Sequence, residues 1–175
     1  MESFLRYILK TQAIADFFRH YAWGWPLMET LHFVGLCLLV GIVGMFDLRL
    51  LGVAKSLPVA PLRRLLPWAV FGFILSVSSG LMFVEGVEAN ISIHPYVVLV
   101  NDIWLELKLL FIFLAGVNLL AFYLTGMSRA VDALGPGEDA PLLAKVIAGT
   151  SLFLWIGVMY FGRLIPFGDF SPPIK

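Results

Sequence analysis

Residues 26–46 have the sequence PLMETLHFVGLCLLVGIVGMF. A helix needs about 20 mostly apolar residues to cross the hydrocarbon core of a bilayer, and this stretch meets that requirement. It also contains Glu29 and His32, three residues apart. Ionisable groups are costly at membrane depth and usually face the interior of a helical bundle or a wet cavity. The stretch therefore predicts a first membrane span and marks where a functional site is to be sought.

The composition of the whole chain is that of an integral membrane protein. Hydrophobic residues make up 60% of the 175 residues, charged residues only 14%, and the mean hydropathy is +0.91. Soluble domains use about 45–50% apolar residues. Lys and Arg together number 12, as do Asp and Glu, so there is no basic excess of the kind that nucleic-acid binding requires. We expect the lipid bilayer as a partner and exclude nucleic acid.

Three more apolar runs are long enough to cross a bilayer. The four predicted spans cover residues about 26–47, 65–86, 103–125 and 143–165. Short connections between successive spans favour antiparallel neighbours. The sequence thus predicts an all-α fold, an integral membrane, up-down-up-down four-helix bundle that forms one domain over residues 1–175.

The segment before the first span has a different pattern. Over about residues 3–22, apolar residues recur near helical spacing with charged residues between them, and Trp23 and Trp25 follow. Such a pattern is typical of an amphipathic helix that lies in the membrane interface, with aromatic side chains as anchors. We expect an N-terminal interfacial helix here.

The positions of the basic residues predict the orientation. Lys and Arg in the loops are found at Arg49, Lys55, Arg63 and Arg64, and then at Arg129 and Lys145. The first and third loops hold all of them, whereas the second loop, residues 86–102, has none. Cytoplasmic loops carry an excess of Lys and Arg. We therefore expect a multi-pass protein of the bacterial inner membrane, with the first and third loops cytoplasmic.

This topology brings polar residues from separate spans to one level near the periplasmic end. The residues concerned are Glu29, His32, Lys108, Tyr160 and Arg163, with His94 in the second loop closing the same end. We predict that Glu29 orients the ring of His32, as carboxylates do for histidines that bind metal. The same residues also allow a purely structural reading, in which they form a buried ion network.

A haem b site is the leading hypothesis for this cluster. It requires an axial imidazole, a slot lined by small residues, and cations for the propionates. His32 is the predicted metal ligand, the small residues between positions 72 and 80 would line the slot, and Lys108 and Arg163 would supply the cations. The small residues serve equally for close helix packing. The second axial position stays open between His94 folding inward and five-coordinate iron.

Other chemistries stay open for the same residues. Copper handling would draw on softer ligands, here the sulfur atoms of Met28, Met82 and Met159. A non-enzymatic accessory subunit would use the cluster only to join helices. With haem bound, the protein would transfer electrons or serve as a redox-active subunit, with other membrane subunits or a quinone-type redox partner. The residues do not decide whether the protein is an enzyme.

Two further polar features have structural interpretations. Asp47 and Arg49 fit charges that end the first span and begin the loop. Asn118, within the third span, fits a hydrogen bond between helices, which is a common use of asparagine in membranes.

The chain resembles a family of small, uncharacterised bacterial four-helix inner-membrane proteins. The matching motifs are Trp25-Pro26-x-x-Glu29-x-x-His32-x-x-Gly35, Asp47-Leu48-Arg49-Leu50-Leu51-Gly52, Trp104-x-x-x-Lys108, and Trp155 followed by Gly162-Arg163. They cover about residues 23–166. The resemblance implies the fold and the membrane and carries no activity with it.

A looser similarity connects the chain to membrane protoporphyrinogen oxidases that bind haem b and to the membrane domain of copper-resistance D-type proteins. It is carried by a histidine in the first span and a lysine early in the third, and it implies His32 as the haem or metal ligand and Lys108 as an essential polar partner. The chain departs from the oxidase pattern at Asp47 and Asn118 and in having no further histidine within a span. The resemblance therefore implies haem binding more than porphyrinogen oxidation.

Overall fold

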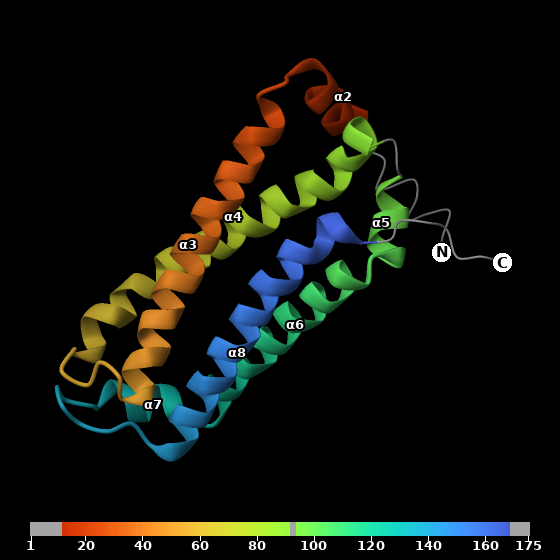
Figure 1. Ribbon diagram of the computed structural model, residues 1–175. Helices are drawn as coiled ribbons and strands as arrows, with labels where there is room; N and C mark the ends of the chain where they lie inside the picture. The colour runs from red at the N-terminus through yellow and green to blue at the C-terminus, as the bar shows by residue number, and fades with distance from the viewer. Residues whose placement is uncertain (1–11, 92–93, 169–175) are drawn as a thin grey trace.

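The computed structural model describes residues 12–91 and 94–168 (Figure 1). Within these ranges every regular element is helical. The helices are α2 (Gln12–His20), α3 (Gly24–Leu51), α4 (Val59–Ile91), α5 (Pro95–Asn101), α6 (Ile103–Leu124), α7 (Met127–Asp132), α8 (Leu142–Leu164) and the 3-10 turn η1 (Ile165–Phe167).

Four helices of the described chain, α3, α4, α6 and α8, are long and apolar enough to cross a membrane. The prediction of a multi-pass membrane protein from composition and apolar runs is confirmed at this level. The helices extend beyond the predicted spans most clearly in α4, which begins at Val59 and includes the charged pair Arg63 and Arg64. An apolar run marks the part of a helix that lies in the hydrocarbon core, and the helix itself can continue into the polar region on either side.

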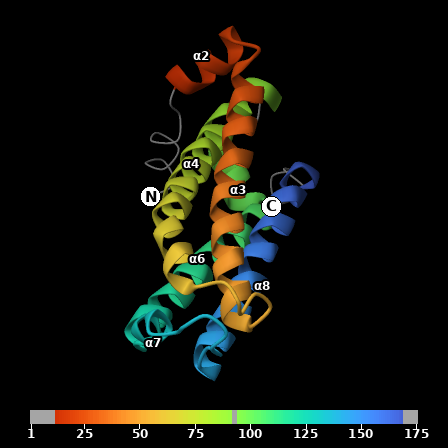
Figure 2. The same cartoon turned by 90° about the vertical axis from the view of Figure 1, so that its left-hand side faces the viewer.

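The predicted N-terminal helix is described only in part. Helix α2 covers Gln12–His20, and residues 3–11 of the prediction lie outside the described residues. Helix α2 crosses the end of the α3–α4 pair (Figure 2). Its Phe18 ring fills the space above Gly86 of α4, and Phe17 lies against Gly24 at the start of α3.

The long helices form two antiparallel pairs, α3 with α4 and α6 with α8 (Figure 1). Helix α3 also contacts α8, where Leu152 lies next to Gly44 and Leu51 lies next to Gly149. Both contacts fall in the second half of α3, near α7. Both views show the two pairs close together at the α7 end and further apart toward α2 (Figures 1 and 2).

Two glycines bring the backbones of α3 and α4 into contact. A Cβ atom at Gly35 would lie 2.7 Å from the carbonyl oxygen of Gly72, and one at Gly72 would lie 2.7 Å from that of Gly35. Helices approach this closely only where small residues line the contact. This contact fixes the register of α4 on α3.

The hydrophobic core lies at the α7 end. Its buried members come from the ends of the four long helices and from the nearby loops: Phe46, Leu50, Val59, Leu62, Phe122, Val131, Ala140, Ala144, Ile147 and Ala148. The rings of Phe46 and Phe122 meet edge to face across the core, with centroids 6.1 Å apart. Much of the remaining apolar surface, such as Phe113 and Leu120 on α6, is exposed, as suits contact with lipid.

Candidate functional site

The ring of His32 faces a neighbouring helix. His32 is half-buried on α3, and its Nδ1 lies 3.0 Å from the Oγ of Ser79 on α4. The ring also lies beside Gly80, where a Cβ atom would come within 3.4 Å of its Cε1. Phe83 meets the ring edge to face at 5.7 Å. The absence of a side chain at Gly80 gives the imidazole its place against α4.

The hydrogen bonds of Ser79 assign the tautomer of His32. The Ser79 hydroxyl donates its single hydrogen to the carbonyl oxygen of Leu75 at 2.7 Å, with Ser76 O at 3.2 Å. With that hydrogen on Leu75 O, Ser79 accepts the hydrogen bond that joins it to His32, and Nδ1 of the ring is the donor. A neutral imidazole that carries its proton on Nδ1 has a lone pair on Nε2. Nε2 is the nitrogen available to a ligand.

Lys108 brings a positive charge to the same region from a third helix. It is half-buried on α6 and interacts electrostatically with the His32 ring. Its Nζ lies 3.4 Å from the position of a Cβ atom at Gly162 of α8, so the missing side chain at Gly162 makes room for it. No carboxylate in the described part of the chain lies within ion-pair distance of Lys108. The structure thus places on α6 an ammonium group that has no ion-pair partner among the described residues and lies within electrostatic range of the His32 ring.

The structure does not bring the other predicted residues into this group. Glu29 is exposed, and Ser79 rather than Glu29 orients the His32 ring. Tyr160 is 61% exposed and Arg163 is also exposed, and neither forms an ion pair with another described residue. The predicted ion network between these side chains is therefore not formed among the described residues.

His94 has a local structural role. It is the N-cap of α5, and its Nδ1 accepts a hydrogen bond of 3.1 Å from the backbone N–H of Tyr96. Because Nδ1 is the acceptor, the ring proton is on Nε2. In this arrangement His94 caps a helix and offers no lone pair to a cofactor.

The part of the chain that the structure describes contains no group of three or more His, Cys, Asp or Glu residues able to hold a metal ion. Of the methionines proposed for copper, Met28 is buried on α3 and Met159 is 40% exposed on α8. A metal held by protein ligands alone is thus not favoured at His32. A group that brings most of its own ligands would need only the imidazole.

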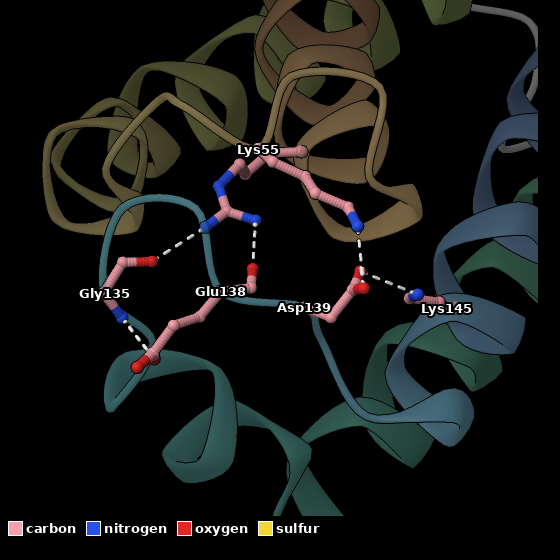
Figure 3. A network of polar contacts seen from close by, with 6 residues as sticks. Lys55, Gly135, Glu138, Asp139 and Lys145 are labelled. Atoms are coloured by element: carbon pink, nitrogen blue, oxygen red, sulfur yellow. Dashed lines mark hydrogen bonds and ion pairs between the residues drawn. The ribbon is translucent and has the colours of Figure 1, made fainter.

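A second polar region lies at the α7 end, centred on Arg49. Arg49 is fully buried, and its guanidinium donates to the backbone oxygen of Leu57 at 2.6 Å. It also donates to the backbone oxygens of Gly135 at 3.1 Å and Glu138 at 3.2 Å, two residues labelled in Figure 3. The interpretation of Asp47 and Arg49 as loop charges needs correction, because both are buried. Arg49 joins the loop after α3 to the loop before α8.

Asp47 and Asn118 connect α8 to its neighbours. Asp47 is 5% exposed and lies beside Ser151. Asn118 donates from Nδ2 to the carbonyl oxygen of Ile147 at 3.0 Å. The predicted hydrogen bond between helices is therefore confirmed for Asn118.

Asp139 strengthens the same junction from its exposed side. Its carboxylate accepts hydrogen bonds from Lys55 at 2.7 Å and from Lys145 at 2.9 Å (Figure 3). These two ammonium groups lower the pKa of Asp139 from 3.8 to about 2. Because the folded state favours the ionised form, the stabilisation is present above pH 3.8 and is lost as the pH falls through about 2.

We expect a titration of the Asp139 carboxyl carbon, followed by NMR, to have its midpoint near pH 2. Lys55→Gln removes the hydrogen bond that contributes most to the lowered pKa of Asp139. The midpoint should therefore rise toward 3.8, the ordinary value for this carboxyl. Arg129→Gln, an exposed change on α7, should leave the midpoint unchanged. A midpoint near 3.8 in the unmodified protein would contradict the two ion pairs.

Two of the residues that build these regions were missed or misassigned from sequence. Ser79 is one of the small residues between positions 72 and 80, and the signal for its role is a hydroxyl on the face of α4 that carries Gly72 and Gly80. For Arg49 the signal was an arginine enclosed by Leu48 and Leu50. A charge within a leucine run needs partners for its donors if it is buried.

No family model matches this chain, and comparisons with curated proteins and with solved structures found no match either. The resemblances to the inner-membrane family, the oxidases and the copper-resistance domains therefore stay predictions.

Proposed function

We propose that the four long helices form an up-down-up-down bundle in a bacterial inner membrane, with the first and third loops in the cytoplasm. The basic residues of those two loops support this orientation. The N-terminal segment lies in the opposite interface, where Trp23 is 56% exposed beside Phe17 and Tyr21. Aromatic clusters of this kind suit the level of the lipid headgroups.

We further propose that the protein binds haem b at His32 and serves in electron transfer, or as a redox-active subunit with other membrane subunits or a quinone-type partner. The observation that carries the proposal is the hydrogen bond between His32 and Ser79, which leaves the lone pair on Nε2. Histidines that bind metal usually donate their other ring N–H to such a partner. A porphyrin brings four nitrogens of its own, so a single imidazole suffices for attachment.

Lys108 supports the same proposal through its charge. A haem carries two propionate groups, and an uncompensated lysine near the axial histidine would attract one of them. Arg163 and Tyr160 are exposed on α8 and would offer a further cation and a hydroxyl to a propionate. Bound haem would supply the one-electron chemistry, and the chain would supply the ligand, its orientation and the cation.

A second candidate is a structural accessory subunit. The contact between His32 and Ser79 joins α3 to α4 whether or not a ligand is present. In that case the imidazole would serve helix packing alone. Copper handling is a weaker alternative, because the described residues gather too few ligands around His32.

The absorption spectrum of the protein purified from cells supplied with haem tests these proposals. We expect a Soret band that His32→Ala abolishes. Ser79→Ala should keep the ligand but weaken haem binding by about 10–100-fold, because the ring loses its orienting partner. His20→Ala, an exposed change on α2, serves as the matched control and should leave the band intact.

A folded, colourless protein would contradict haem binding and favour the accessory subunit. Copper found by elemental analysis in such a protein, and lost in His32→Ala, would favour the copper alternative. Circular dichroism of each variant shows whether loss of the band reflects loss of ligand or loss of fold.

A further inference from the structure

Arg64 stands near the start of α4, far along that helix from Ser79, where His32 of α3 makes its contact. Arg64 is exposed, and no acceptor in the described part of the chain takes a hydrogen bond or ion pair from it. It lines an open hollow with a volume of about 410 Å³, together with Ala60, Arg63 and Asp132. The hollow faces outward at the membrane end that carries the first and third loops.

The charges of the hollow leave Arg64 free to bind an anion. Arg63 donates to Ser128 O at 3.1 Å and to Ser128 Oγ at 2.6 Å, and it pairs with Asp132. Arg63 is thus committed to α7, and Asp132 compensates its charge. The positive charge that remains in the hollow belongs to Arg64.

An exposed aromatic surface continues from this charge along α4. Ala60, Arg64, Trp68 and Phe71 follow one another at intervals of four, four and three residues, so they share one face of the helix. Trp68 is 59% exposed and Phe71 is 50% exposed, and their rings meet edge to face at 6.2 Å. One face of α4 therefore presents a cation, then a tryptophan, then a phenylalanine.

We propose that this face of α4 binds an anionic phospholipid, with the headgroup phosphate on Arg64 in the hollow and an acyl chain against Trp68 and Phe71. A guanidinium matches the geometry of a phosphate and binds it through two parallel hydrogen bonds. Basic pockets at the ends of membrane helices are known to hold such headgroups. The aromatic surface favours a lipid over free phosphate, because phosphate alone would leave it uncovered. The site is independent of the haem proposal.

The test uses the full chain in mixed micelles, with native mass spectrometry to count bound lipids. We expect the protein to retain phosphatidylglycerol in preference to phosphatidylcholine of the same acyl chains. Arg64→Gln should reduce that retention at least about tenfold, because the charge-assisted hydrogen bonds to the phosphate are lost. Arg129→Gln, which removes another exposed arginine at the same end, is the matched control and should keep the preference.

Two further experiments distinguish binding of a whole phospholipid from binding of phosphate alone. Trp68→Ala should weaken retention of phosphatidylglycerol, and inorganic phosphate at millimolar concentration should fail to displace the lipid. Equal retention by Arg64→Gln and the unmodified protein would overturn the proposal. Displacement by inorganic phosphate, with Trp68→Ala unaffected, would overturn it in favour of a simple phosphate site. Circular dichroism confirms that each variant keeps its helices.

Discussion

Replacing Gly72 with leucine is expected to force α3 and α4 apart. A Cβ atom at position 72 would lie 2.7 Å from the carbonyl oxygen of Gly35 and 2.9 Å from the backbone nitrogen of Leu39. Both are backbone atoms of a helix and cannot turn aside as a side chain would. Overpacking of a tight contact costs about 1–3 kcal/mol and occasionally more. We expect a loss of stability at the upper end of that range.

The measurement is unfolding in mixed micelles, followed by circular dichroism as the denaturing detergent increases. The NMR signal of His32 Nδ1 should change as well. The hydrogen bond between Nδ1 and Ser79 depends on the register of α3 against α4, and the contact between Gly35 and Gly72 sets that register. Gly116→Leu is the control, since a Cβ atom there would meet nothing within 4 Å. Equal stability losses at positions 72 and 116 would show that the helices do not touch at Gly35 and Gly72.

The second large effect is expected for Arg49→Ala. The change removes a fully buried guanidinium and leaves three backbone oxygens in two loops without their donor. A buried polar group without a partner costs about 1–3 kcal/mol, and water reaches some of these loop carbonyls. We expect the free energy of unfolding to fall by about 3 kcal/mol in total. Proteolysis should then cut residues 133–141 faster than in the unmodified protein.

Arg49→Lys separates charge from geometry. A lysine keeps the positive charge, but its single ammonium cannot reach three carbonyls arranged around a planar guanidinium. We expect a stability between those of the unmodified protein and Arg49→Ala. Arg129→Ala, at an exposed arginine of the same region, should stay within about 0.5 kcal/mol of the unmodified protein. If Arg49→Ala left the free energy of unfolding unchanged, the loops would hold together without this side chain.

The membrane helices could be predicted because composition reports directly on what lipid requires. Long apolar runs identified α3, α4, α6 and α8, and the asparagine in the third span predicted a hydrogen bond between helices, which Asn118 makes to Ile147. The start of α4 at Val59 could not be predicted in the same way. Arg63 and Arg64 are too polar for the apolar run, but arginine is a good helix former. The apolar run and the helix therefore begin at different residues.

The candidate site was predictable in His32 and Lys108. The cost of burying an ionisable group singled out His32, and the half-buried Lys108 lies near enough to act on it. Ser79, the partner of His32, could not be predicted, because the pairing depends on the register of α4 against α3. The contact between Gly35 and Gly72 sets that register. The exposure of Glu29 and Arg163 depends on how each helix is rotated about its axis. Spacing along one helix fixes neither register nor rotation relative to another.

The arrangement of the two helix pairs has a mechanical consequence. Packing and polar contacts fasten them at the α7 end, where Arg49 and the hydrophobic core lie, and they diverge toward α2 (Figures 1 and 2). Helix α5 contacts both α4 and α6 and so connects the two pairs at the other end. By simple geometry, a small change in the angle between the pairs at the α7 end would displace the α2 ends of α3 and α4 the most, and His32 lies in the half of α3 nearer those ends.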